Sequence, residues 1–128
     1  MITSSDIESL IGKPFGNDGF NCYSLAKEVF KYFNIDIPTY DIGDIDPCCS
    51  TSVNELIIRF KSHWVEIDKP EIPCIIFIKN DVKLINHVGV CISSTHFLHA
   101  LKKSGVVLNS LYDPYWVRRF RGYYKYGH

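Results

Sequence analysis

The stretch 19–33 of this chain, GFNCYSLAKEVFKYF, carries the clearest structural pattern in the sequence. A loop with a glycine leads into a run in which apolar residues recur every three or four positions and charged residues fill the positions between. This period is typical of an amphipathic helix with one face in a core. The sequence therefore predicts a helix over residues 22–33, which begins at Cys22 and cannot continue through Pro38.

Weaker patterns predict the elements on either side of this helix. Residues 4–11 are expected to form a first helix capped by Ser4 or Ser5, and Ser52-x-x-Glu55 resembles a capping box before an amphipathic run. From Trp64 onward the apolar period changes to two. This period predicts strands near residues 64–67, 74–79, 86–92, 96–100, 105–108 and 115–126.

This order of elements predicts an α+β fold in which N-terminal helices pack on a β-sheet. The sheet should be antiparallel, because the gaps between the predicted strands are too short for helical crossovers. With 128 residues, we expect a single domain over residues 1–128.

The composition excludes several classes of partner. Fourteen basic and fourteen acidic residues cancel, so no net field directs the chain to nucleic acid or to an anionic membrane. The N-terminus has no basic and apolar signal segment, and no apolar run approaches the ~20 residues of a membrane span. We therefore expect synthesis in the cytoplasm without a signal peptide, and neither a nucleic-acid nor a membrane partner.

Cys22 is the strongest candidate for a reactive side chain among the five cysteines. It stands where the loop enters the helix, and a helix N-terminus favours the thiolate, which is the nucleophile. We expect this junction to let the sulfur point out of the protein body. Cys74 and Cys91 lie inside apolar strand runs and should be core residues, whereas Cys48 and Cys49 form a loop pair without a nearby base. The cysteine spacing matches no metal site, so no metal or other cofactor is expected.

A thiol nucleophile needs a base, and His87 and His99 are the candidates. Alternation in the run HVGVCI places His87, Gly89 and Cys91 on one face, and the glycine should leave open space above the His87 ring. A tight turn makes the two histidine strands neighbours, so His99 can orient His87, with both rings on the Cys22 side. Two structural histidines, or a metal site formed by both rings and Cys91, are the alternatives.

Three segments together resemble the NlpC family of papain-like cysteine peptidases, which are bacterial cell-wall hydrolases, and most of all its short members encoded among phage tail genes. These segments are GFNCYSLAKEVFKYFNIDIP, HVGVCISSTHFLHALKKSGVVL and WVRRFRGYYKY. The resemblance implies a papain-like core with Cys22 as nucleophile, His87 as base and His99 as the orienting third residue. It also implies a cysteine endopeptidase or amidase that cleaves stem peptides of peptidoglycan, commonly between D-glutamate and a diamino acid.

The chain departs from the family pattern at three positions. Asn21 and Tyr23 stand where many members have an Asp and a Ser that hold a substrate amine, so these two residues are the candidates for substrate binding. Phe15 stands where many members have a Tyr that stabilises the oxyanion. The backbone N–H of Cys22 is then the expected donor to the oxyanion. The stretch 40–50 matches nothing in the pattern and is expected to shape the groove.

Two other functions fit the same residues. A papain-like acyltransferase or lipid-directed thioester enzyme would use the same chemistry, and a non-catalytic phage-tail module would keep only the fold. An open groove above Cys22 would favour a peptide, and an apolar tunnel would favour an acyl chain. The expected partners are a peptidoglycan stem peptide and phage-tail or secretion-apparatus proteins. The expected place of action is the cell wall, reached as a virion component or after release.

Overall fold

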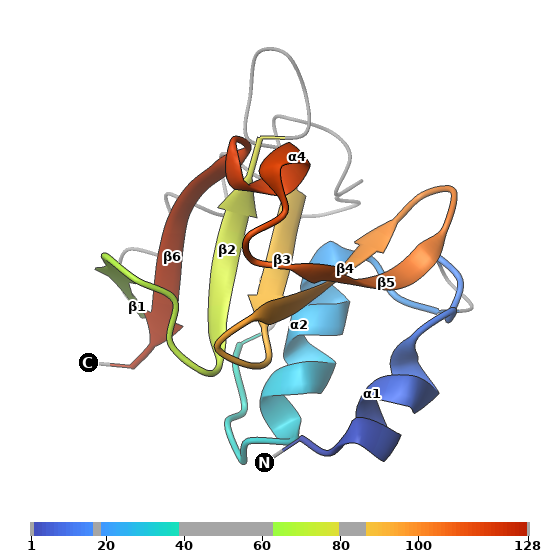
Figure 1. Cartoon of the computed structure of the whole chain (residues 1–128). Helices are drawn as coiled ribbons and strands as arrows, with labels where there is room; N and C mark the ends of the chain where they lie inside the picture. Colours follow the sequence, from blue (N-terminus) through green and yellow to red (C-terminus); the bar gives the residue numbers. More distant parts are fainter. Residues whose placement is uncertain (1, 17–18, 39–62, 80–86, 128) are drawn as a thin grey trace.

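The computed structural model describes residues 2–16, 19–38, 63–79 and 87–127. These residues form two N-terminal helices, a six-stranded sheet and a short helix before the last strand (Figure 1). The predicted capping box at Ser52, the pair Cys48 and Cys49 and the stretch 40–50 lie outside the described residues.

Helix α1, Ser4–Leu10, has a different N-cap from the one that the sequence suggested. Thr3, not Ser4 or Ser5, caps the helix: its Oγ1 accepts a hydrogen bond from the Asp6 backbone N–H at 3.1 Å. The Asp6 carboxylate in turn accepts the Thr3 N–H at 2.9 Å. Thr3 takes this position because an acidic residue follows three positions later and completes a capping box.

Helix α2, Cys22–Lys31, confirms the main prediction and begins at the expected residue. The Asn21 side chain accepts the Ser24 N–H at 2.8 Å, and Ser24 Oγ accepts the Asn21 N–H at 2.9 Å. The helix ends two residues before the predicted end, because Asn34 adopts a left-handed φ of 61° and turns the chain away. The apolar face of the helix is completely buried by Leu25, Ala26, Val29 and Phe30.

The six strands form one antiparallel sheet in the order β1-β6-β2-β3-β4-β5. Their bounds are β1 Trp64–Ile67, β2 Cys74–Ile78, β3 His87–Cys91, β4 His96–Leu101, β5 Gly105–Ser110 and β6 Phe120–Tyr126. The predicted α+β class with N-terminal helices and an antiparallel sheet is confirmed.

The predicted last strand, 115–126, is only partly correct. Its first residues form helix α4, Pro114–Val117, and β6 begins at Phe120. Asp113 caps this helix by accepting the Tyr115 N–H at 2.9 Å, and Pro114 occupies the first turn. A capping Asp followed by Pro is a helix-start signal that outweighs the β preference of the aromatic residues after it.

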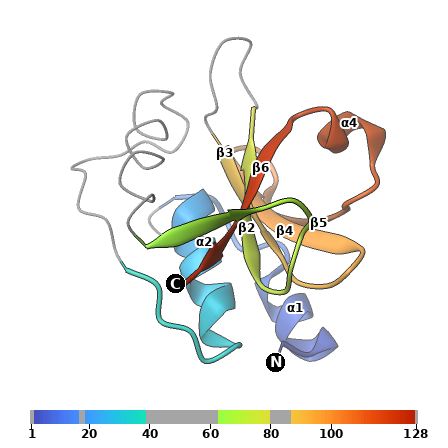
Figure 2. The same cartoon turned by 90° about the vertical axis from the view of Figure 1, so that its left-hand side faces the viewer.

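The two faces of the sheet are covered by different helices, as the side view in Figure 2 shows. On one face, α2 packs against apolar residues of several strands, among them Ile75, Val88 and Leu98. On the opposite face, Trp116 of α4 packs in a second cluster with Phe97. The histidine strands β3 and β4 therefore lie between two apolar layers.

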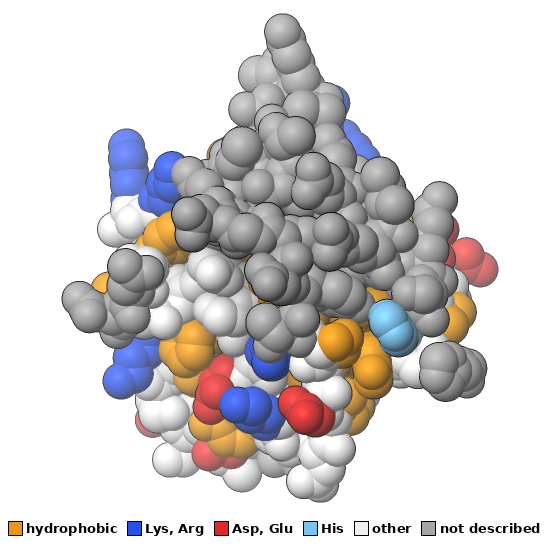
Figure 3. Space-filling model, turned by 180° about the vertical axis from the view of Figure 1, so that it is seen from behind, with side chains coloured by type: hydrophobic (Ala, Val, Ile, Leu, Met, Phe, Trp, Pro, Cys, Tyr) orange, Lys and Arg blue, Asp and Glu red, His pale blue; other side chains and the backbone are white. Residues whose placement is uncertain are grey.

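Charges of both signs are interspersed on the surface seen in Figure 3. On the outer side of α2, Lys31 lies 3.8 Å from Glu28. Within the described part of the chain, no helix has both the length and the apolar character needed to cross a bilayer.

Candidate active site

Cys22 is the first residue of α2, so its side chain lies at the helix end that carries partial positive charge. The side chain is only 2% exposed and shares a buried cluster with Leu25 and Val88. The prediction of a sulfur that points out of the protein body is therefore wrong. The thiol lies among apolar side chains, although the helix start is where it was expected.

The candidate nucleophile and base belong to elements that start at the same end of the sheet. Helix α2 and strand β3 run in the same direction, and α4 lies at the end where β3 begins (Figure 1). His87 is the first residue of β3, and α2 packs on β3 and β4. The first residues of α2 and β3 are Cys22 and His87, the two residues that the sequence proposed as a pair.

Two imidazole rings and one amide form a continuous chain of hydrogen bonds. His87 Nε2 lies 2.9 Å from His99 Nδ1, and His99 Nε2 lies 2.6 Å from Asn109 Oδ1. His87 is 4% exposed and His99 is completely buried. The structure thus brings the two predicted histidines into direct contact and adds a third residue that the sequence analysis did not single out.

Both rings have low pKa values because of where they lie. Burial and, to a lesser extent, the neighbouring His99 lower the pKa of His87 from 6.5 to about 3. Burial also lowers the pKa of His99 from 6.5 to about 4, although its hydrogen bond to Asn109 acts in the opposite direction. Both rings are therefore neutral at neutral pH, and each keeps one ring nitrogen that can accept a proton or a hydrogen bond.

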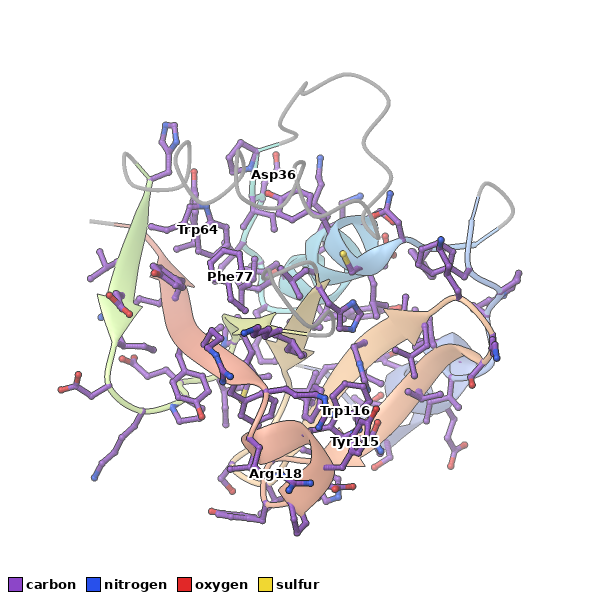
Figure 4. All side chains as sticks on the ribbon, turned by 90° about the horizontal axis from the view of Figure 1, so that it is seen from above. Asp36, Trp64, Phe77, Tyr115, Trp116 and Arg118 are labelled. Carbon is purple, nitrogen blue, oxygen red and sulfur yellow. The ribbon has the colours of Figure 1, made fainter. Side chains whose placement is uncertain are left out.

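Aromatic side chains close around the histidines. The His99 ring centroid lies 4.7 Å from that of Phe97 and 4.6 Å from that of Trp116. A Cβ atom at Gly89 would lie 2.8 Å from Phe97 Cδ2. The predicted open space above the His87 ring is therefore wrong, since the Phe97 ring fills the space above Gly89 and requires a residue without a side chain there. Figure 4 shows Trp116 beside the strands and Arg118 on the outer side of α4.

The rings project from the sheet face that α4 covers. Alternation along β3 is as predicted, because Val88 and Val90 pack in the cluster that contains Cys22. Phe97 and Trp116, which contact the His99 ring, belong to the cluster on the opposite face. The prediction that both rings lie on the Cys22 side of the sheet is therefore wrong. His87 is nevertheless the first residue of β3, at the end of the sheet where α2 also begins.

A family model connects this arrangement to known proteins. The model described as the NlpC/P60 family matches residues 12–125, which is most of the chain. The chain belongs to the NlpC/P60 family. The predicted family is therefore confirmed, whereas the narrower resemblance to phage-tail members receives no support from the comparisons.

Two bacterial proteins with named activities are among the curated relatives of this chain. The chain is 44% identical over 34 residues to "Murein DD-endopeptidase MepS/Murein LD-carboxypeptidase" of Escherichia coli (strain K12), which covers 27% of the chain and 18% of that protein. It is 30% identical over 103 residues to "Probable endopeptidase NlpC homolog" of Haemophilus influenzae, which covers 80% of the chain and 46% of that protein. The chain spans less than half the length of these relatives.

A solved NlpC/P60 structure has the same fold. The crystal structure of a protein similar to lipoprotein, of the NLP/P60 family, from Staphylococcus aureus superposes with a TM-score of 0.58 at 18% identity. The match covers 94% of this chain and 38% of the other. At 18% sequence identity, this structural similarity supports the fold alone and not the activity.

The two residues that depart from the NlpC/P60 pattern next to Cys22 both make structural contacts. Asn21 caps α2 through Ser24, and the Tyr23 hydroxyl donates a hydrogen bond to the Pro38 carbonyl oxygen at 2.6 Å. Tyr23 thus ties the start of α2 to the segment that follows the helix. The substrate-binding role of Asn21 and Tyr23 stays a prediction.

The cysteines of the NlpC/P60 sheet are core residues, as predicted. Cys74 and Cys91 pair across β2 and β3, and both are completely buried. The hydrogen bond with Cys91 and burial raise the pKa of Cys74, which keeps that thiol protonated. The described residues contain no group of three or more His, Cys, Asp and Glu side chains that could hold a metal ion.

Two residues of this arrangement, Asn109 and Trp116, were not predicted from the sequence. Asn109 lies just beyond the predicted strand 105–108, whereas β5 continues to Ser110. An Asn within an apolar strand run is uncommon, and this was the signal that could have identified it. Trp116 was assigned to a strand, so its position over the histidines could not be foreseen.

Proposed function

We propose that this NlpC/P60 domain is a cysteine endopeptidase or amidase that hydrolyses amide bonds in peptidoglycan stem peptides. The observation that carries the proposal is the buried His87–His99 pair, located at the sheet end where α2 begins with Cys22. Family membership supports the substrate class, as do the murein endopeptidase and carboxypeptidase activities named for the relatives.

In this proposal Cys22 is the nucleophile and His87 is its base. His87 accepts the thiol proton as the sulfur attacks the carbonyl carbon of the scissile amide. The C–N bond then breaks, the amine leaves with the proton from His87, and a thioester to Cys22 remains. Water, deprotonated by His87, attacks the thioester, so that the acid leaves and the thiol is restored.

His99 orients the base, and the helix start stabilises the oxyanion. The hydrogen bond between His87 Nε2 and His99 Nδ1 fixes the plane of the His87 ring and directs its Nδ1 edge away from His99. The backbone N–H of Cys22 is in the first turn of α2, where helix geometry supplies no intrahelical acceptor. This N–H donates to the developing oxyanion.

Asn21 and Tyr23 complete the proposal as residues that flank Cys22 and face the substrate stem peptide. We also propose that the chain acts on the cell wall and is delivered there by a phage tail or a secretion apparatus. This part of the proposal rests on the sequence resemblance alone. An acyltransferase with the same site would give transfer products in the test below. A non-catalytic tail module would give no products.

Digestion of purified peptidoglycan, followed by mass analysis of the soluble fragments, tests the proposal. The wild-type chain is expected to release fragments that differ by hydrolysis of one stem-peptide amide bond. Cys22→Ser should release none above background, because the serine hydroxyl stays protonated at neutral pH and is a far weaker nucleophile than a thiolate. Tyr115→Phe, on the exposed side of α4, is the matched control and should digest like the wild type.

The absence of amide cleavage by the wild-type chain on several peptidoglycan types would contradict the proposal. Transfer of an acyl group to an added amine without hydrolysis would assign the chain to the acyltransferases. Equal digestion by Cys22→Ser and wild type would remove Cys22 from the mechanism.

A further inference from the structure

The third member of the hydrogen-bond chain, Asn109, is placed by the pairing of β4 with β5. In this antiparallel pair, His99 is opposite Val107 and Phe97 is opposite Asn109. Asn109 and His99 are thus diagonal neighbours on one face, a distance that a longer side chain can span. The Asn109 amide reaches the ring, and its Oδ1 lies 2.6 Å from His99 Nε2.

The hydrogen bond to Asn109 determines which ring nitrogen of His99, and then of His87, carries the proton. A carbonyl oxygen only accepts hydrogen bonds, so His99 Nε2 must carry a proton and donate it to Asn109 Oδ1. A neutral His99 then has an unprotonated Nδ1, which can only accept from His87 Nε2. A neutral His87 with its proton on Nε2 keeps the lone pair on Nδ1, and Nδ1 has no hydrogen-bond partner among the described residues.

The opposite arrangement would disable the base. If His99 Nε2 were the acceptor, His99 Nδ1 would donate to His87 Nε2, and the His87 proton would move to Nδ1. The ring edge that is not bonded to His99 would then carry a proton and could accept none. The His99 ring is completely buried, so bulk water cannot replace Asn109 as its hydrogen-bond partner. The tautomer of His99 therefore depends on Asn109.

We propose that Asn109 is a positioning residue that holds both imidazoles in the tautomers that leave the His87 Nδ1 lone pair available as the base. This inference rests on the proposed function in which His87 is the base for Cys22. Asn109 acts through His99 and has no assigned contact with substrate. The lowered pKa values of both rings agree with it, since neutral rings are the ones for which a tautomer must be selected.

Nitrogen-15 NMR of the imidazoles in the resting, full-length chain tests the tautomers without any substrate. In the wild type at neutral pH, both Nε2 atoms should show the protonated chemical shift and both Nδ1 atoms the unprotonated one. In Asn109→Leu the acceptor is lost, and the His99 signals should move toward a mixture of tautomers. Val107→Thr, on the same strand and face, is the matched control and should keep the wild-type pattern.

The variant Asn109→Asp tests whether residue 109 acts as a hydrogen-bond acceptor or only fills space. The carboxylate still accepts from His99 Nε2, so the wild-type tautomers should remain, and its charge should raise the pH at which His99 protonates. On peptidoglycan, Asn109→Leu should lose kcat by about 10- to 100-fold with KM little changed, the range found for outer partners that orient a metal-bound imidazole. Asn109→Asp should recover most of that loss and shift the pH profile.

Unchanged tautomers in Asn109→Leu would overturn the inference, as would an Asn109→Asp variant in which neither the tautomers nor the His99 titration respond. If Asn109→Leu does not fold, the Asp variant alone decides, since its titration shift requires the contact and not merely the volume. A chain that hydrolyses no peptidoglycan but shows the Asn109-dependent tautomers would refute the proposed function and leave the tautomer assignment standing.

Discussion

The two histidines occupy unequal positions along one chain of contacts. His87 is at the free end, beyond which no described residue bonds to its Nδ1, whereas His99 is bonded at both ring nitrogens, to His87 and to Asn109. A group that is bonded on both sides can orient a neighbour but has no lone pair left to remove a proton. The geometry therefore separates a base from its orienting partner.

Replacement of each histidine by Asn should show this difference. His87→Asn should lose about 10²- to 10⁴-fold in kcat, because an amide is no base. His99→Asn can still present a carbonyl oxygen toward the His87 ring and should keep measurable activity, whereas His99→Ala should lose more. Rates on one peptidoglycan preparation decide the matter. Equal losses for His87→Asn and His99→Asn would mean that the roles are assigned wrongly.

The thiols should differ in reactivity although all three described ones are buried. Cys22 lies at a helix N-terminus, which favours the thiolate, whereas Cys74 is held protonated by its contact with Cys91 and by burial. Limiting iodoacetamide at neutral pH, followed by peptide mapping, should label Cys22 first. Earlier labelling of Cys48, Cys49, Cys74 or Cys91 would refute this expectation.

At the scale of elements, the fit between β3 and β4 depends on Gly89. A methyl group at this position would lie 2.8 Å from the Phe97 ring, which is itself packed against His99. Gly89→Ala is therefore expected to lower the free energy of unfolding by about 1–3 kcal/mol, as overpacking does. In a Phe97→Leu background the same change should cost less, because the ring is gone.

Urea unfolding of the two single variants and the double variant measures this coupling. A Gly89→Ala loss that is identical in both backgrounds would show that Phe97 does not impose the glycine.

The elements differ in how far the sequence could predict them. Helix α2 and the inner strands follow from periodicity, because ten or more residues, or a clean alternation, identify the buried face. Helix α4 spans only Pro114–Val117, too short for any period, so only the Asp113–Pro114 cap could reveal it. Asn109 depended on the register of β4 against β5, and register is a pairing between distant residues that one strand alone does not encode.

The sheet face on which each site residue lies was harder to predict than the identity of the site residues. Cys22, His87 and His99 could be selected from local context, but the sheet face that each occupies depends on which helix covers that face. The α4 turn and Trp116 cover the histidine face, and neither was predicted.

At the scale of the whole molecule, the buried histidines link stability to pH. In the folded chain the pKa is about 3 for His87 and about 4 for His99, both below the ordinary 6.5. Below pH 6.5 the unfolded chain takes up two protons that the folded chain does not, so stability is lost as pH falls. Well below 6.5 and above about 4, the slope should approach about 2.7 kcal/mol per pH unit from these two rings.

Urea unfolding at a series of pH values measures this slope. His99→Gln should reduce the slope by the share of one proton. A flat profile between pH 6 and 5 would contradict the burial of neutral rings.

The most direct measurement of covalent catalysis by Cys22 is peptidoglycan digestion in the presence of hydroxylamine, with mass analysis of the new carboxyl ends. A Cys22 thioester can be attacked by hydroxylamine as well as by water. Wild-type digests should therefore contain fragments that end in a hydroxamate, in proportion to the added hydroxylamine, and Cys22→Ala digests should contain neither these nor the free acids. Free acids alone from the wild type at every hydroxylamine concentration, or fragments of either kind from Cys22→Ala, would show that no thioester to Cys22 is formed.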